Sequence, residues 1–231
     1  MTTIKSKTCT SCGSTFDAED IFMGERLLWS ITTCDPCNEK EVAAQEEQER
    51  KKRLEARKTQ FWCDVPPLYQ GTDKSQLQGQ LVAVIDAWEY GTKGIGFIGK
   101  SGAGKTRAAV LLLQRIAMDG KSICFMKSVK LTKYAADKFS DDKYEAEIAK
   151  EKIRQAYRSK LLLIDDIGKG RLSPTAEELL FDIIDERTER GLPIIWTSNS
   201  GAKALREMLS QDRADALIRR LAEFTTVTHI N

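Results

Sequence analysis

The stretch GFIGKSGAGKT, Gly96 to Thr106, constrains the fold of this chain more than any other feature. It fits the pattern Gly99-x4-Gly104-Lys105-Thr106, with an apolar run before it and the amphipathic segment RAAVLLLQRIA after it. A strand, a glycine-rich loop and a helix in this order cradle the phosphates of a nucleoside triphosphate, because backbone N–H groups and the helix N-terminus converge on the anion. The chain is therefore predicted to contain a P-loop nucleotide-binding core.

Each residue type in this loop has a chemical role. Lys105 is expected to reach the β and γ phosphates of ATP, and the Thr106 hydroxyl is expected to bind Mg²⁺. The residues expected to hold the nucleotide are Gly99, Lys100, Ser101, Gly102, Ala103, Gly104, Lys105, Thr106 and Arg107.

The pattern around the loop alternates between apolar runs and amphipathic segments. Strands are predicted at residues 94–98, 122–126, 160–164, 192–197 and 224–229. Helices are predicted near residues 76–90, 105–118, 128–158, 174–190 and 201–222. Strands that alternate with helices form a parallel sheet covered on both faces, so we expect a three-layer α/β/α domain.

The segment KLLLIDDIG, Lys160 to Gly168, predicts a second part of the same site. Four apolar residues end in two carboxylates at the C-terminal end of a buried strand, which is the edge where parallel sheets bind ligands. Asp165 is expected to hold Mg²⁺ and Asp166 to polarise the water that attacks the γ-phosphate. The alternative is a pair of acids that caps a loop.

A third strand, LPIIWTSN, delivers Thr197, Ser198 and Asn199 at its end. A neutral amide at this edge can orient the attacking water without adding charge, so Asn199 is predicted to be catalytic. The alternative is that Asn199 only caps the helix that begins near Gly201.

Four of the six cysteines form two Cys-x-x-Cys pairs, Cys9 with Cys12 and Cys34 with Cys37. Each pair aims two thiolates at one point, and two pairs complete the tetrahedral sulfur shell of a structural zinc site. We therefore predict a small zinc-binding module at residues 1–38, of the treble-clef or ribbon type. Disulfides or a redox pair are the alternative. Cys63 and Cys124 stand alone and are expected to be packed thiols.

Residues 39–62 carry charge nearly everywhere and contain neither glycine nor proline. This composition predicts a solvated helical linker between the zinc module and an ATPase domain at residues 63–231. The basic run RKKRLEARK near its end fits either nucleic-acid phosphates or a solvent-exposed face with i, i+4 ion pairs.

The charge of the whole chain is nearly balanced, with 36 basic and 34 acidic side chains. Contact with nucleic acid must therefore be local, and Lys127, Lys130 and Lys133 are candidates for it. No apolar run reaches the roughly 18 residues of a membrane span, so we expect a cytoplasmic protein that does not contact the membrane. The single histidine, His229, offers no basis for a catalytic triad.

The motifs GKSGAGKT, LLLIDDIG and DERTERGLPIIWTSN, in this order and spacing, resemble those of the AAA+ ATPases of the DnaC helicase-loader group. The resemblance covers about residues 65–231. It implies a five-stranded parallel sheet in the order 5-1-4-3-2, which brings the three motifs to one γ-phosphate, and no C-terminal lid domain. The lead-in VPPLYQG resembles the segment that opens the ATPase core in that group.

The segment ALIRRLAEF resembles the arginine-finger helix of the group, which implies that Arg220 reaches the ATP of a neighbouring subunit in a homo-oligomer. Arg213 and Arg219 are the alternatives. The resemblance further implies an ATP-dependent loader that binds a DnaB-type replicative helicase and assists its placement on single-stranded DNA. The alternatives are an IstB-like helper of transposition and a nucleotide-binding adaptor that does not hydrolyse ATP.

Overall fold

The computed structural model describes residues 2–199 and 201–230, without the side chains of residues 2, 3, 201, 202, 204, 211 and 212. The chain divides into two compact units, Met1–Ala56 and Arg57–Asn231. The predicted domain boundaries after residues 38 and 62 remain predictions.

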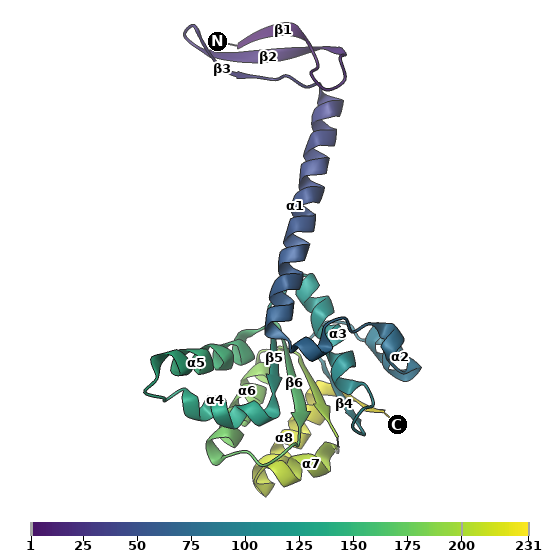
Figure 1. The fold of residues 1–231 in the computed structure, drawn as a ribbon, viewed down its shortest axis with the longest axis vertical. Coiled ribbons are helices and arrows are strands. Elements are labelled where there is room, and N and C mark those ends of the chain that lie inside the picture. The colour runs from purple at the N-terminus through teal and green to yellow at the C-terminus, as the bar shows by residue number, and fades with distance from the viewer. Residues whose placement is uncertain (1, 200, 231) are drawn as a thin grey trace. The chain divides into compact units, whose positions relative to one another are not determined.

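The first unit is built on a three-stranded antiparallel sheet in the order β1-β2-β3 (Figure 1). Its strands are β1 (Thr2–Thr8), β2 (Thr15–Met23) and β3 (Arg26–Ser30). Helix α1 (Asp35–Asp64) begins in this unit, and its last two turns belong to the second. Most of α1 is exposed and carries ion pairs along its surface, including Arg53 with Glu49 at 2.9 Å, as the composition of this segment predicts.

The second unit contains a five-stranded parallel sheet in the order β5-β6-β7-β4-β8. The strands are β4 (Gly94–Gly99), β5 (Ile123–Lys127), β6 (Leu161–Ile167), β7 (Ile194–Ser198) and β8 (Thr225–Ile230). With β4 counted as the first strand of this domain and β8 as the fifth, the order read from β8 is 5-1-4-3-2. The order that the resemblance implied is therefore confirmed. Each strand lies within two residues of its predicted start.

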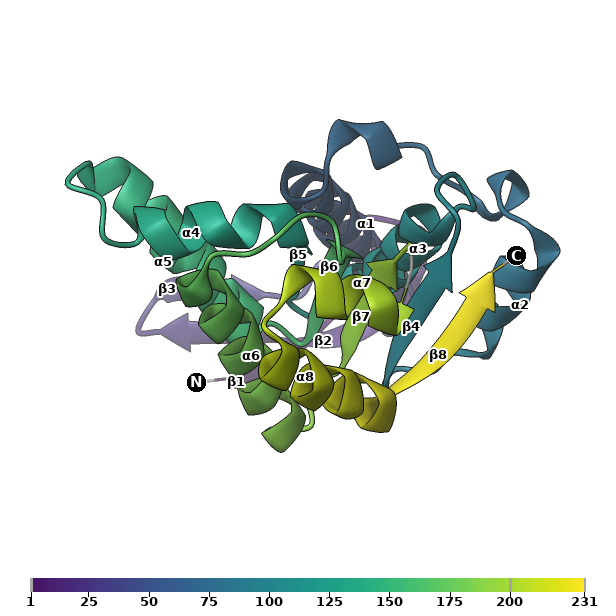
Figure 2. The same cartoon turned by 90° about the horizontal axis from the view of Figure 1, so that it is seen from below.

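Helices cover both faces of this sheet, and Figure 2 shows α3 on one side with α6 and α8 on the other. The first face packs against the end of α1, α2 (Gly79–Ala87) and α3 (Lys105–Met118). The helices of the second face are α4 (Leu131–Asp137), α5 (Lys143–Arg158), α6 (Pro174–Glu189), α7 (Gly201–Met208) and α8 (Gln211–Phe224). Short 3-10 turns lie at Pro67–Tyr69, Lys74–Gln76 and Ser128–Lys130.

Successive side chains along each strand point to opposite faces of the sheet, and so they contribute to the hydrophobic cores on both faces. In β6, Leu161 and Leu163 face the α3 side, whereas Leu162 and Ile164 face the α6 side. Gly96 in β4 has no side chain because the Trp196 indole of β7 occupies that space, and a Cβ there would lie 2.3 Å from the ring. The three-layer architecture is therefore confirmed. Within the described residues, no helix is both long and apolar enough to span a membrane.

Candidate functional site

The carboxyl ends of three adjacent strands carry the residues that the sequence singled out. β7 lies between β4 and β6 in the sheet, so the P-loop after β4, the acids at the end of β6 and Asn199 after β7 meet at one edge. Adjacent parallel strands lie about 4.8 Å apart, which is within reach of these side chains. The structure thus brings the three motifs together.

Lys105 lies at the centre of this edge and is only 5% exposed. Its ammonium group donates hydrogen bonds to the carbonyls of Gly99 at 2.9 Å and Lys100 at 2.8 Å, and to Asn199 Oδ1 at 3.0 Å. Burial lowers the pKa of Lys105, and the nearby carboxylates of Asp166 and Asp165 oppose that shift. A buried cation held among carbonyl oxygens is poised to exchange them for phosphate oxygens.

Asp165 is 1% exposed and accepts two hydroxyl hydrogen bonds. Thr106 Oγ1 donates to Asp165 Oδ1 at 2.7 Å, and Thr197 Oγ1 donates to the same oxygen at 2.8 Å. Burial raises the pKa of Asp165, which the two hydroxyls partly offset. A hydroxyl and a carboxylate oxygen this close are the hard ligands that Mg²⁺ takes in P-loop proteins, so these residues fit the ion.

Asp166 has a left-handed backbone with φ of 59°, the one positive φ outside glycine among the described residues. The strand register shifts at this point, between Ile164 and Ile167, which turns the Asp166 side chain away from the alternation of β6. Such a conformation costs about 1–3 kcal/mol and persists only where the surroundings hold it.

Two hydroxyls hold the Asp166 backbone. Its N–H donates to Thr197 Oγ1 at 2.9 Å, and its carbonyl accepts from Ser128 Oγ at 2.6 Å. Thr197 therefore joins Asp165 to Asp166, a role that the sequence analysis did not assign to it. The available signal was its position at the end of β7, beside the two acids in the predicted sheet.

The helix that follows the P-loop begins after Gly104, whose φ of 86° requires glycine. Arg107, in the first turn of α3, donates to Thr72 Oγ1 at 2.7 Å and to Gln76 Oε1 at 3.2 Å. The lead-in segment after α1 is therefore fastened to the start of α3, beside the P-loop. Burial raises the pKa of Tyr69 in this segment, and the charge of Asp165 adds to the effect.

The residues predicted to contact a neighbouring subunit or DNA form other contacts in this structure. Arg220 on α8 forms an ion pair with Asp185 of α6 and stacks its guanidinium 5.4 Å from the centre of the Phe181 ring. Lys133 forms an ion pair with Asp137 at 2.7 Å, whereas Lys130 is exposed.

The four paired cysteines, Cys9, Cys12, Cys34 and Cys37, bring their sulfur atoms within 4.8 Å of one another. The sulfurs of Cys12 and Cys34 are 3.6 Å apart, close to the roughly 3.8 Å edge of a tetrahedron with 2.3 Å zinc–sulfur bonds. The Cys34 N–H donates to Cys9 Sγ at 3.4 Å; this contact first, and then further backbone contacts from Cys12 and Ser11, lower the pKa of Cys9 to about 6 against the opposing effect of burial. Hydrogen bonding with the Cys12 and Cys34 thiols raises the pKa of Cys37 to about 12. The cluster therefore fits zinc.

Metal analysis checks this fit. The parent chain is expected to carry about one zinc ion, and the double variant Cys34→Ser/Cys37→Ser is expected to lose it, because two remaining thiolates do not make a closed site. Cys63→Ser is the matched control, because Cys63 lies outside the cluster and is exposed; the expectation that it is packed was wrong, while Cys124 is buried as expected. A parent that folds without zinc would contradict the assignment.

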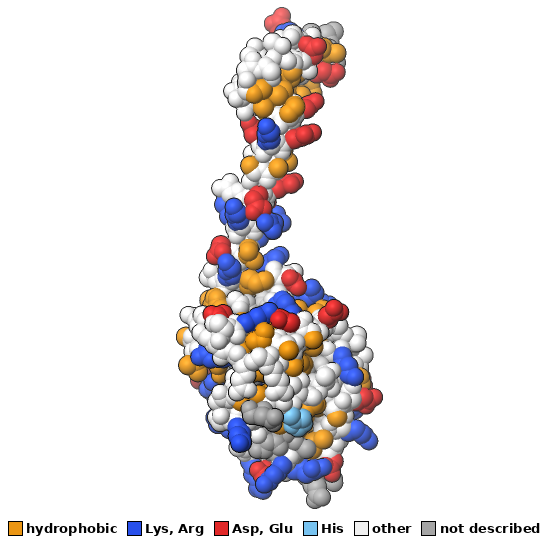
Figure 3. Space-filling model, turned by 90° about the vertical axis from the view of Figure 1, so that its right-hand side faces the viewer, with side chains coloured by type: hydrophobic (Ala, Val, Ile, Leu, Met, Phe, Trp, Pro, Cys, Tyr) orange, Lys and Arg blue, Asp and Glu red, His pale blue; other side chains and the backbone are white. Residues whose placement is uncertain are grey.

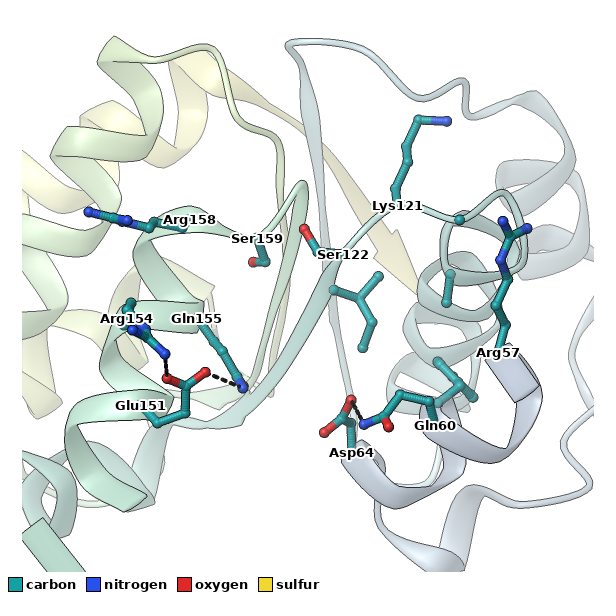
Figure 4. Close-up of a pocket in the computed structure, with 14 residues that line it drawn as sticks. Arg57, Gln60, Asp64, Lys121, Ser122, Glu151, Arg154, Gln155, Arg158 and Ser159 are labelled. Atoms are coloured by element: carbon teal, nitrogen blue, oxygen red, sulfur yellow. Dashed lines mark hydrogen bonds and ion pairs between the residues drawn. The ribbon is translucent and has the colours of Figure 1, made fainter. Parts of the chain in front are cut away.

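A groove of about 520 Å³ lies at the opposite end of the sheet, where β5 begins (Figure 4). Its floor includes Phe61 and Ile123, and its rim includes Arg57, Arg154 and Arg158. The C-terminal ends of the helices α1, α3 and α5 lie close to it. Arg57 Nη1 donates to the carbonyl of Met118, at the end of α3, at 2.9 Å. The residues that line this groove therefore include no glycine-rich loop at a helix N-terminus, which is the feature that binds phosphate at the P-loop.

Comparison with known proteins agrees with this site. The sequence profile of the family described as "IstB-like ATP binding protein" matches residues 38–231. The chain is 29% identical over 137 residues to the "Insertion sequence IS232 putative ATP-binding protein" of Bacillus thuringiensis subsp. berliner, which covers 59% of this chain and 52% of that protein. The chain thus spans about half the length of this curated relative.

Two solved structures share the fold. The crystal structure of DnaI superimposes with a TM-score of 0.59 at 17% sequence identity, over 72% of this chain and 95% of that chain. The crystal structure of the DnaC helicase loader gives a TM-score of 0.50 at 22% identity, over 74% of this chain and 99% of that chain. At these identities the likeness concerns the fold alone.

Proposed function

Because this chain belongs to the family of IstB-like ATP-binding proteins, we propose that it is an ATP-dependent loader of a DnaB-type replicative helicase onto single-stranded DNA. The observation that carries the ATPase part is the contact between Lys105 and Asn199 beside the bonded pair of Thr106 and Asp165. The loader part is supported by the likeness of the fold to DnaI and to the DnaC helicase loader.

In this proposal the P-loop binds ATP and Mg²⁺ together. Lys105 would exchange its carbonyl contacts for the β and γ phosphates, and Thr106 and Asp165 would hold the metal ion. When bound there, Mg²⁺ would supply positive charge that neutralises the negative charge on the phosphate oxygens. Thr197 keeps the Asp165 carboxylate in position.

Asp166 and Asn199 act on the attacking water. The Asp166 carboxylate, whose side chain is 31% exposed, accepts a proton from that water. The Asn199 amide orients the same water. Lys169, on the loop that follows, forms an ion pair with the Asp166 carboxylate at 3.7 Å.

A second candidate function is that of an ATPase helper of transposition. The curated relative named above is an insertion-sequence ATP-binding protein, which favours this function. The two functions share the nucleotide site and differ in the partner, a replicative helicase or a transposase. A third function, an adaptor that binds ATP without hydrolysis, differs in chemistry alone.

Measurements of partner binding and of ATP hydrolysis together distinguish the three candidate functions. The parent chain is expected to co-purify with a DnaB-type helicase in the presence of ATP and to release phosphate slowly, faster with single-stranded DNA. Asp166→Asn is expected to keep nucleotide binding and to lower phosphate release by about 100-fold, because the water loses its proton acceptor. Nucleotide binding by the parent without phosphate release above the protein-free rate would indicate the adaptor. Stable binding of a transposase without the helicase would indicate the transposition helper.

We further propose that Arg220 completes the site of a neighbouring subunit. Arg220 is bound within its own chain to Asp185, and both side chains are about 30% exposed. To reach a neighbour's γ-phosphate the guanidinium must exchange this carboxylate for phosphate oxygens, which are also bidentate acceptors. The exchange would couple hydrolysis to assembly of a homo-oligomer.

Mixing two inactive variants tests whether Arg220 acts as an arginine finger. Arg220→Ala supplies an intact P-loop and Lys105→Ala an intact finger, so mixed oligomers are expected to hydrolyse ATP faster than either variant alone. Arg219→Ala is the matched control, because its exposed side chain lies beside Arg220 on the same helix and its loss should change hydrolysis less than about twofold. No recovery at any mixing ratio would remove Arg220 from the mechanism.

A further inference from the structure

The N-terminal module, residues 2–37, exposes many large apolar side chains for its size. Of the thirteen exposed large hydrophobic residues in the described part of the chain, six lie between residues 4 and 29. They are Ile4, Ile21, Met23, Leu27, Leu28 and Trp29. Trp29 is 55% exposed and Ile4 67% exposed, and soluble domains rarely leave such side chains clustered in water without a partner.

The strand register places four of these side chains on one face of the sheet. Ile21 of β2 lies opposite Trp29 of β3, and Ile4 of β1 lies opposite Glu19, one diagonal step from Ile21. Met23 follows Ile21 on the same side of β2. We call these residues, Ile4, Ile21, Met23 and Trp29, the apolar face.

The opposite face of the same sheet makes its contacts within the module. Asp20, 6% exposed, pairs with Lys7, whose ammonium also donates to Ser30 Oγ at 2.7 Å. Leu27 lies opposite Phe22 on that side. One face of the sheet is thus internally bonded, whereas the apolar face is open to solvent.

Charged side chains flank the apolar face at both ends, with opposite signs. Asp17 and Glu19 point to the same side as the apolar residues of β2 and form its acidic end. Arg26 lies opposite Met23 on that side and forms its basic end. Glu25 lies in the turn between β2 and β3, beyond the paired residues. Figure 3 shows hydrophobic side chains gathered on this module, with charged side chains beside them.

This arrangement of charge is complementary to itself. A strand rises about 3.4 Å per residue, so Met23 and Glu19 lie about 7 Å to either side of Ile21 along β2. A two-fold axis that crosses the strands at Ile21 reverses the strand direction in a second copy of the chain. The basic end of each copy then meets the acidic end of the other, and the apolar side chains cover one another at the centre.

The area fits such a contact as well. Burial of the apolar face and its charged ends in two copies removes on the order of 1,000 Å² of accessible surface, which is the lower end for a specific interface. A nucleic-acid backbone fits the face less well, because its phosphates would meet two carboxylates for each cation. Residues 1–37 as a whole hold five carboxylates and three cationic side chains, which disfavours phosphate further.

We propose that the apolar face of the N-terminal module joins two copies of this chain in a two-fold contact, with Arg26 of each copy beside Asp17 and Glu19 of the other. Trp29 is the anchor of this contact, since a half-exposed tryptophan beside an aliphatic side chain offers the largest area to bury. The contact requires no nucleotide, unlike an assembly in which Arg220 reaches a neighbour's ATP. It is also independent of the proposed function.

Sedimentation velocity of the full chain without nucleotide measures this contact. The parent is expected to form dimers, and Trp29→Ser and Ile21→Ser are each expected to weaken dimerisation about tenfold or more. Phe139→Ser is the matched control, because Phe139 is 77% exposed on the second unit and its loss should leave dimerisation unchanged. Circular dichroism of each variant shows whether the fold survives.

Exchange of charge tests the orientation of the two copies. Arg26→Glu brings a carboxylate against the acidic end of the second copy, and Asp17→Lys/Glu19→Lys brings lysines against its basic end. Each variant alone is therefore expected to dimerise more weakly than the parent. An equimolar mixture of the two is expected to form dimers again, because every contact in the mixed dimer joins opposite charges.

The outcomes are distinct. Weaker dimerisation in the module variants, retention in Phe139→Ser and recovery in the mixture support the two-fold contact. A parent that is monomeric at every concentration overturns it, as does equal dimerisation by the parent and Trp29→Ser. Two charge variants that stay monomeric when mixed overturn it too. A labelled thymidine oligonucleotide that binds the parent but not Trp29→Ser, with sedimentation unchanged, overturns it in favour of nucleic acid.

Discussion

Replacing Lys105 by alanine is expected to weaken ATP binding by roughly 100-fold or more and to abolish hydrolysis. The ammonium group is the buried cation of the site, 5% exposed, with the carbonyls of Gly99 and Lys100 and the amide of Asn199 around it. In the proposed mechanism it faces the β and γ phosphates. Charge-assisted hydrogen bonds in a partly buried site contribute about 1.5–3 kcal/mol each, so loss of two of them accounts for this change.

Titration with a fluorescent ATP analogue measures the affinity, and thermal unfolding shows whether the fold survives. Lys93→Ala is the matched control, because Lys93 is exposed just before β4 and far along the strand from the P-loop. Its affinity is expected to equal that of the parent. An affinity of the Lys105→Ala variant within threefold of the parent would remove the P-loop from nucleotide binding.

Much of the ATPase unit could be predicted because its signals are local. The run LLLI before Asp165 is apolar at every position, as in a strand buried on both faces, and the structure has β6 there with helices on either side. Ser173 and Pro174 likewise mark the start of α6, where the Ser173 hydroxyl accepts from the Ala176 N–H at 3.3 Å.

The rest depends on contacts between distant segments, which have no local pattern. The left-handed backbone of Asp166 exists because Thr197 and Ser128, from β7 and from the turn after β5, hold it. The ion pair of Arg220 with Asp185 joins α8 to α6. Nothing in a run of nearby residues specifies these partners.

Arg187 is the clearest example of a residue whose contacts could not be predicted from the sequence. In the sequence it lies within the charged run DERTER, which is typical of the solvent side of a helix. In the structure its side chain is 0% exposed. Nη1 donates to the carbonyls of Ala156 at 2.8 Å and Ser159 at 2.9 Å, and Nη2 donates to that of Pro193 at 2.9 Å. Arg187 thus joins the end of α5 to the starts of β6 and β7.

Burial lowers the pKa of Arg187 to about 10, so the guanidinium remains charged at neutral pH. Its partners are backbone carbonyls at the negative end of α5, which stabilise a cation without a carboxylate. Any shorter side chain leaves these carbonyls buried without donors, and each such group costs about 1–3 kcal/mol. The residue therefore fastens three elements at the edge of the sheet opposite the nucleotide site.

Replacing Arg187 by alanine is accordingly expected to lower the free energy of unfolding by about 3–5 kcal/mol, since it leaves both a cavity and unpaired carbonyls. Arg187→Met, which fills most of the cavity, should recover only part of this loss, because the carbonyls stay unpaired. Arg190→Ala is the matched control: Arg190 lies at the C-terminal end of α6 and pairs with Glu186 at 3.1 Å on the surface, where such a pair contributes less than about 1 kcal/mol. Urea unfolding of the three variants measures the difference. If Arg187→Met matched the parent, the buried side chain would stabilise the fold by filling space, and its hydrogen bonds to α5, β6 and β7 would contribute nothing to stability.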